Sequence, residues 1–233
     1  MDTTTDTPVP EATETAETTR ATVRDAVVLG LAVGVSGLAF GAAGTAAGLS
    51  VAQTSVLSFV AFTGGSQFAL VGAIAGGGSL AAGVAGAWLL GLRNTLYGVR
   101  LARTLAVRGP RRLVAAHGVI DETTAMAVAR TSPAQARIAF WSTFATLFVV
   151  WNLSTVAGAA GSARLGDPSA LGIDAVVPAA FLALLAPRLR DRVQLPVALV
   201  GALIALVAVP LAPAGLPVLL AAAAVLVGLR RAT

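Results

Sequence analysis

Long apolar runs, separated by short polar or charged stretches, occupy the chain from Ala26 to Leu229. A membrane-spanning helix needs about 20 apolar residues, with a range near 17–25. The runs that meet this length without help are 26–49, 53–76 and 137–160. The other apolar runs are 80–107, 113–129, 172–187, 194–211 and 214–229. Prolines interrupt the last three, so we expect these to pack inside a bundle whose neighbours satisfy the freed backbone groups. The pattern predicts an all-α polytopic membrane protein, a helical bundle of about seven transmembrane segments.

The stretch FTGGSQF at 62–68 interrupts one of these runs. The adjacent Gly64 and Gly65 each weaken a helix by about 1 kcal/mol relative to alanine. The side chains that can hydrogen-bond backbone groups freed by a break are Thr63, Ser66 and Gln67. Unwound backbone within a membrane is tolerated only where it is buried or lines a cavity. We therefore expect at least one broken or re-entrant helix here; the alternative is that the glycine pair only permits tight packing.

A broken helix at this place has a chemical use. In transporters, the N-terminus of a half-helix points at the carboxylate of the substrate, which the helix dipole and the free N–H groups attract. We expect the carboxylate to be received by Gly64, Gly65, Ser66 and Gln67. Apolar residues expected around the side chain of the substrate are Phe62, Phe68 and Leu96.

Arginines indicate how the chain crosses the membrane. Residues 1–22 are rich in Thr, Glu, Pro and Ala and predict a disordered tail, followed by a membrane domain over 23–233. Arg20 and Arg24 before the first run, and Arg230 and Arg231 at the end, predict that both termini are cytoplasmic. If 26–49, 53–76 and 80–107 all cross, however, the arginines that follow fall outside. Either one of the middle segments is re-entrant, or 113–129 crosses and these arginines are an exception to the positive-inside rule.

Glycines on the first run are spaced as three G-x-x-x-G pairs: Gly30, Gly34, Gly37, Gly41, Gly44 and Gly48. Such spacing lets helix backbones approach closely. We interpret these glycines as packing positions, against this chain or against a partner.

Composition agrees with the membrane interpretation and excludes several classes of protein. The chain of 233 residues is 56% hydrophobic and 12% charged, whereas soluble domains have about 25% charged residues. No cysteine is present, which excludes disulfides and thiolate metal sites. The net charge of +5 comes from arginines that lie beside apolar runs, which argues against a nucleic-acid partner. The absence of lysine together with abundant alanine is typical of a GC-rich bacterial genome, and we expect the bacterial cytoplasmic (inner) membrane.

A second polar insertion lies in LLGLRNTLYGVRLAR at 89–103. Arg93 and Asn94 follow an apolar run, and Arg93 shares a helical face with Tyr97 and Arg100. An arginine at membrane depth is expensive and is usually paired or facing water. Arg93 is thus a candidate to hold a substrate carboxylate, with Asn94 beside it; the alternative is an arginine that snorkels to the membrane edge.

Acidic residues supply candidates for proton coupling. Asp121 and Glu122 are adjacent within an otherwise apolar stretch, where like charges favour protonation of one of the two. The alternative is a loop or helix cap at the interface. Asp174 begins the 172–187 run, where an N-cap role is the simpler explanation. His117 is the one histidine and is interpreted as a loop residue.

Four stretches together resemble one family, the AzlC family of bacterial branched-chain amino acid permeases. They are FTGGSQFALVG at 62–72, LRNTLYGVRLA at 92–102, DETTA at 121–125 and LGIDAVVPAAFLALL at 171–185. The resemblance implies an exporter of branched-chain and related amino acids, and a small hydrophobic membrane partner of the AzlD type. In the second motif this chain departs from the family, with Gly91 where asparagine is common and Asn94 where histidine is common.

The sequence thus favours a secondary transporter, driven by an ion or proton gradient, that exports aliphatic amino acids. We expect no cofactor, no metal and no enzymatic activity; no P-loop motif is present, so ATP is not bound directly in that way. The alternatives are an exporter of another small zwitterionic or hydrophobic solute, a non-transporting scaffold subunit, and a membrane hydrolase.

Overall fold

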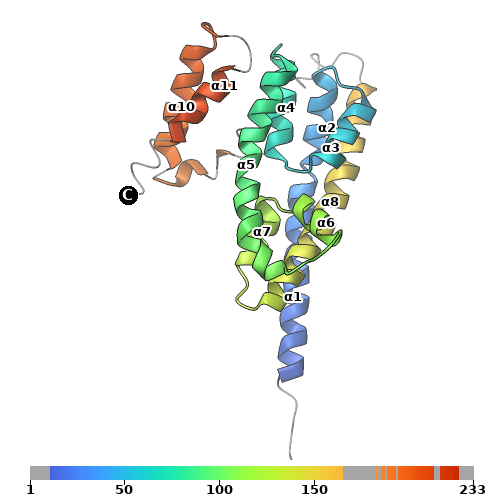
Figure 1. The fold of residues 1–233 in the computed structure, drawn as a ribbon. Helices are drawn as coiled ribbons and strands as arrows, with labels where there is room; N and C mark the ends of the chain where they lie inside the picture. The colour runs from blue at the N-terminus through green and yellow to red at the C-terminus, as the bar shows by residue number, and fades with distance from the viewer. Residues whose placement is uncertain are drawn as a thin grey trace, which may run out of the picture. The chain divides into compact units, whose positions relative to one another are not determined.

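The computed structural model describes residues 11–164, 182, 185, 186, 188–192, 194–212 and 216–225, and these contain helices and no strand (Figure 1). Chain contacts define two compact units. Unit 1 comprises 1–34 and 96–150, and unit 2 comprises 35–95 and 151–233. The long helices α5 (Leu80–Leu105) and α8 (Pro133–Ala163) each contribute one half to each unit.

Unit 1 contains α1 (Glu11–Gly34) and two short helices, α6 (Arg111–His117) and α7 (Asp121–Val128). Its core is an apolar cluster drawn from α5, α6, α7, α8 and the turn after α6: Leu101, Leu105, Ala115, Val119, Ala127, Ala136 and Phe140. Polar contacts attach α1 to the start of α8 and to the second residue after α7. Arg130 forms a salt bridge with Asp25 at 3.2 Å, and Gln135 donates to Thr19 at 2.9 Å.

The first helix begins inside the segment for which the composition predicted disorder. α1 starts at Glu11, and Thr22 on this helix is completely buried. Its residues between 11 and 22 include the good helix formers Glu and Ala. Burial of Thr22 and the bond from Gln135 to Thr19 add tertiary contacts that a composition argument does not see.

Unit 2 contains α2 (Gly37–Ala46), α3 (Val51–Val60) and α4 (Gly65–Ala75). A capping box starts α3: the Ser50 hydroxyl accepts from the Gln53 N–H at 3.1 Å, and Gln53 Oε1 accepts from the Ser50 N–H at 2.8 Å. Because the turn at 47–50 brings Thr54 against Gly44, α3 runs back alongside α2. Farther along the chain, α10 (Gln194–Ala208) packs against α11 (Leu216–Ala221).

Glycines allow α2 and α8 to approach closely within unit 2. A Cβ atom at Gly37 would overlap the carbonyl oxygen of Trp151, and one at Gly41 would overlap that of Thr155. On α8, a Cβ atom at Gly158 would overlap the Leu38 carbonyl in turn. The predicted role in packing is therefore confirmed at Gly30, Gly37, Gly41 and Gly44, whose partner is this chain, whereas Gly48 has no neighbouring atom within 4 Å.

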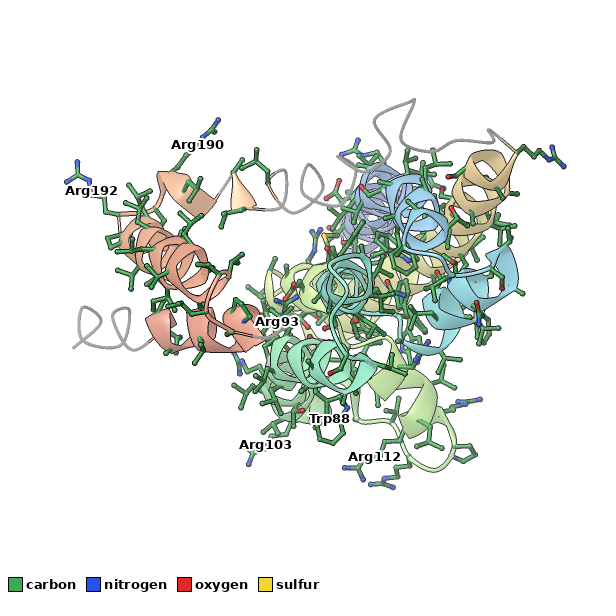
Figure 2. The ribbon with its side chains drawn as sticks, turned by 90° about the horizontal axis from the view of Figure 1, so that it is seen from above. Trp88, Arg93, Arg103, Arg112, Arg190 and Arg192 are labelled. Atoms are coloured by element: carbon green, nitrogen blue, oxygen red, sulfur yellow. The ribbon has the colours of Figure 1, made fainter. Side chains whose placement is uncertain are left out.

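Polar and apolar side chains are distributed as in a membrane protein rather than a soluble one. Fully buried side chains include several hydroxyls: Thr22, Thr54, Ser58, Thr123, Thr143 and Thr155. Large apolar side chains such as Trp88 on α5, 77% exposed, instead face outward (Figure 2). Within a bilayer, burying apolar surface between helices gives no hydrophobic driving force, because the lipid tails are equally apolar. Helices therefore associate through small and hydroxyl residues.

Within the described part of the chain, two helical stretches are long and apolar enough to cross a membrane, Thr18–Ala46 and Pro133–Ala163. The predicted run at 53–76 does not form one spanning helix, because it is divided between α3 and α4. The run at 113–129 is likewise divided, between α6 and α7. Glycine accompanies both interruptions, at Gly64 and Gly118.

Candidate functional site

The predicted break in the second apolar run is present. α3 ends at Val60, α4 begins at Gly65, and residues 61–64 between them are not helical. Gly64 is the N-cap of α4 and has φ 59° and ψ −91°. A side chain at such a φ is strained, so glycine is the residue that permits this turn. The sequence prediction of a broken helix is confirmed here.

The start of α4 lies beside α5 within unit 2. A Cβ atom at Gly65 would lie 3.6 Å from Nη2 of Arg93, and one at Gly91 would lie 3.7 Å from Ser66 Oγ. Farther along, Gly83 meets Leu70 and Ala73, so α4 and α5 are antiparallel. The fold therefore brings the Arg93 guanidinium to the N-terminus of α4.

This helix terminus carries unused hydrogen-bond donors. No side chain caps it, and its first turn holds no acidic residue. Among the described residues, the N–H groups of Gly65 and Ser66 have no hydrogen-bond partner, and neither has the buried Ser66 hydroxyl. Two N–H groups, a hydroxyl and a nearby guanidinium form a set of donors suited to a carboxylate.

Gln67 has a structural task that its place in the motif did not reveal. Its Nε2 donates to the carbonyl oxygens of Leu57 at 3.3 Å and Ser58 at 3.2 Å. These carbonyls belong to the last turn of α3, where the break removes helical partners. The Gln67 side chain is only 1% exposed. Its two hydrogen bonds tie the half-helices together, although it was expected to touch substrate.

The aromatic and apolar residues of the prediction are not equivalent. Phe68 is buried and makes edge-on contacts with Phe40 and Trp151, with ring centroids 5.5 and 6.4 Å away. Phe62 is also buried. Leu96, by contrast, is 71% exposed on α5, and its expected contact with the substrate stays a prediction.

Asn94 follows Arg93 on α5 and is partly buried. Its Oδ1 is enclosed and has no hydrogen-bond partner within the described residues. A buried acceptor of this kind is costly to leave unsatisfied, by roughly 1–3 kcal/mol. Asn94 thus remains a candidate for a polar contact with a bound molecule.

The acidic pair Asp121 and Glu122 begins α7 in unit 1. Both side chains are partly buried and occupy the first turn, where the helix dipole favours negative charge. Thr123 completes this terminus: its buried hydroxyl accepts from the Ile120 N–H at 3.1 Å and donates to the Gly118 carbonyl at 2.6 Å. The helix-cap interpretation of this motif thus has a structural basis, and the coupling role stays a prediction.

Two other expectations concern Asp174 and metals. Asp174 lies outside the described residues. Among the residues that are described, no group of three or more acidic or histidine side chains is placed to hold a metal ion.

His117, which was interpreted as a loop residue, is the last residue of α6, and its ring lies 5.7 Å from that of Phe148.

Comparison with protein families decides the classification. The sequence model of the AzlC protein matches residues 28–165. The chain belongs to the AzlC family. AzlC proteins are associated with amino-acid transport, and the family is one of transporters rather than enzymes. The match includes α2 to α7, and with them the break at Gly64, Arg93 and the start of α7. No curated protein and no solved structure matched the chain significantly.

Some of the contacts at this AzlC site had no local signal. The hydrogen bond from Ser58 to Thr155, at 3.1 Å, joins α3 to α8 and so attaches the first half of the broken helix to α8. Both residues look like ordinary hydroxyls in apolar runs. A weak signal was the helical spacing of Thr54 and Ser58, which puts two hydroxyls on one face of a short helix.

Proposed function

We propose that this AzlC protein is a secondary transporter that exports branched-chain or related aliphatic amino acids across the bacterial cytoplasmic membrane. The observation that carries the proposal is the uncapped N-terminus of α4, with Arg93 next to it. A zwitterionic amino acid has one carboxylate, and this terminus offers donors and positive charge but no acid of its own.

We propose that this terminus lies near the middle of the membrane, and helix lengths support this depth. α3 and α4 have 10 and 11 residues, which corresponds to about 15 Å each. That is half the roughly 30 Å of a bilayer core. α3 runs back alongside α2 and α4 runs antiparallel to α5. These directions support a re-entrant pair whose turn reaches the middle of the membrane.

This arrangement also accounts for the arginines after α5. A re-entrant α3–α4 pair does not cross, so α5 returns to the side on which α1 began. Arg108, Arg111 and Arg112 then lie on the cytoplasmic side together with Arg20 and Arg24, as the positive-inside rule requires. We propose a multi-pass protein with its N-terminus, and also its C-terminal Arg230 and Arg231, in the cytoplasm.

For energy coupling, we propose that Asp121, Glu122 and Asp174 carry the exchanged proton. Support comes from the adjacency of Asp121 and Glu122 in a partly buried position. A small hydrophobic AzlD-type membrane subunit is proposed as the partner, from the family membership.

The proposal is tested by transport of labelled leucine in vesicles that contain the purified chain, with and without the small partner subunit. The competitors are leucine, leucinamide, which lacks the carboxylate, and 4-methyl-2-oxopentanoate, which lacks the amino group. We expect leucinamide to compete at least about tenfold more weakly than leucine, because charge-assisted bonds to the carboxylate are lost.

Equal competition by leucine and leucinamide would contradict carboxylate recognition at α4. Transport by the chain alone would exclude a purely scaffolding role. Absence of leucine flux in both preparations, with the protein folded, would contradict the proposed function itself.

A further inference from the structure

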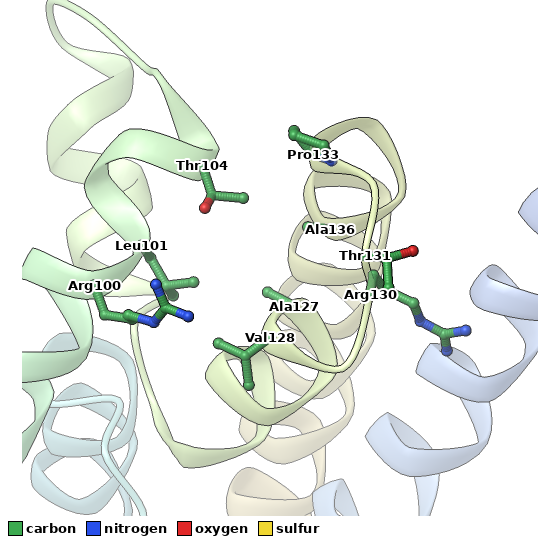
Figure 3. Close-up of a pocket in the computed structure, with 9 residues that line it drawn as sticks. All are labelled: Arg100, Leu101, Thr104, Ala127, Val128, Arg130, Thr131, Pro133 and Ala136. Atoms are coloured by element: carbon green, nitrogen blue, oxygen red, sulfur yellow. The ribbon is translucent and has the colours of Figure 1, made fainter.

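Unit 1 contains a pocket that plays no part in the proposed transport site. It lies between the end of α5, the end of α7 and the start of α8, and has a volume of about 190 Å³. Its floor is apolar, formed by the buried Leu101, Ala127 and Ala136. The polar side chains at its mouth come from α5: Figure 3 shows Arg100 and Thr104 directed into the space toward α7 and α8.

A second guanidinium, outside the lining of the pocket, is held close to it by Thr104. Arg137, next to the lining residue Ala136, donates from Nε to the Thr104 carbonyl oxygen at 2.8 Å. An arginine has five N–H donors, and this bond uses one of them. Arg130, another lining residue, turns its guanidinium outward to Asp25 on α1 (Figure 3). The pocket thus has Arg100 in its lining and Arg137 beside it, and the lining residue Arg130 is paired with Asp25.

Charge and exposure around the pocket favour an anion. Residues 96–150 hold seven arginines and two acidic residues. Arg100 is exposed, and within the described residues it forms no salt bridge or hydrogen bond. The planar guanidinium group binds phosphate oxygens in pairs, which makes a phosphate the natural ligand of such a mouth.

The neighbouring surface indicates where that phosphate comes from. Leu96 and Val99 are 71% and 73% exposed and lie one turn before Arg100 and Arg103 on the same face of α5. An apolar, lipid-exposed stripe that ends in arginines matches the division of a phospholipid into acyl chains and charged headgroup. Basic pockets between membrane helices bind such headgroups.

We propose that this pocket binds the phosphate headgroup of an anionic phospholipid, held by Arg100, Arg137 and Thr104, with an acyl chain along Leu96 and Val99. The bound lipid bridges the end of α5 to α7 and α8, and so stabilises unit 1.

The test uses native mass spectrometry and thermal unfolding of the full purified chain. Phosphatidylglycerol, phosphatidylcholine and inorganic phosphate are added separately. We expect phosphatidylglycerol to bind and to raise the midpoint of unfolding, and phosphatidylcholine and inorganic phosphate to have little effect. R100Q should weaken phosphatidylglycerol binding about tenfold.

R112Q is the matched control, because Arg112 is an exposed arginine of unit 1 outside the pocket. It removes the same charge and should bind phosphatidylglycerol as the unsubstituted chain does. R100K keeps the charge and should recover a large part of the binding, which also shows that the R100Q effect is not misfolding.

Equal weakening in R100Q and R112Q would show attraction by general surface charge and would overturn the proposal. Stabilisation by inorganic phosphate, lost in R100Q, would assign the pocket to a soluble phosphate compound and overturn the lipid as its source.

Discussion

Two pairs of short helices invite comparison, α3 and α4 in unit 2 and α6 and α7 in unit 1. In each pair a short turn, 61–64 or 118–120, separates the helices, and a second helix N-terminus begins there. At α7 the chain supplies its own acids, Asp121 and Glu122, and the hydroxyl of Thr123. At α4 it supplies neither an acid nor a cap, and an arginine stands beside it.

The comparison indicates that a helix N-terminus can have two different uses. A helix start attracts negative charge whatever the source of that charge. Where side chains of the protein itself occupy the helix N-terminus, as at α7, the turn is complete without a ligand. Where no described side chain occupies the N-terminus, as at the partly buried turn before α4, a ligand can satisfy the donors, and binding energy becomes available for recognition.

The strongest test of this contrast is Arg93→Gln, which removes the charge beside α4. We expect leucine transport to fall by about tenfold or more, because a charge-assisted bond contributes roughly 1.5–3 kcal/mol. The measurement is initial flux in vesicles. Arg103→Gln, at the far end of the same helix, is the control and should transport normally. Comparable loss in both variants would contradict a specific role of Arg93.

A second test adds a methyl group at the turn itself. Gly64→Ala meets no neighbouring atom within 4 Å, so its effect is backbone strain alone, of order 1–3 kcal/mol. Gly77, at the other end of α4, has φ 71° and equally free surroundings. We expect Gly64→Ala and Gly77→Ala to lower thermal stability alike, and only Gly64→Ala to reduce flux. Normal flux in Gly64→Ala would separate the turn from transport.

The filled terminus at α7 is tested by Thr123→Val, which keeps the shape and removes the hydroxyl. Loss of its two bonds should destabilise the protein by about 1–2 kcal/mol, measured as a lower unfolding midpoint. Thr124→Val is the neighbouring control, since the buried Thr124 hydroxyl has no hydrogen-bond partner in the described part of the chain. Thr124→Val should therefore leave stability unchanged or slightly higher. A larger loss of stability in Thr124→Val than in Thr123→Val would contradict a stabilising role of the Thr123 hydroxyl at the start of α7.

The smallest expected change follows from Asp121→Asn combined with Glu122→Gln. Removing first-turn charges from α7 should lower stability by only about 0.3–1 kcal/mol. The informative measurement is flux as a function of an imposed proton gradient. Flux that no longer responds to the gradient would support proton coupling through this pair, whereas an unchanged response would leave the pair as a helix cap.

The sequence predicted some of these features and missed others, for identifiable reasons. Adjacent glycines weaken a helix locally, so the break at Gly64 was visible in the pattern. Apolar length alone misled at 53–76, because it measures how much hydrophobic chain is present and not how far one helix continues. The sequence did not show that Leu96 would be 71% exposed, because the packing around α5 decides which of its faces is covered.

The sequence by itself determined that the chain suits a membrane, where its second helix breaks, and to which family it belongs, because hydropathy, glycine propensity and motif order are properties of local sequence. Only the tertiary structure decided that Arg93 reaches the start of α4, that Gln67 serves the carbonyls of α3, and that the glycines of α2 receive α8. The contacts of Arg93 and of the α2 glycines join segments far apart in the chain, and the Gln67 contact joins two separate helices. They depend on how whole helices pack, and no short stretch of residues encodes that.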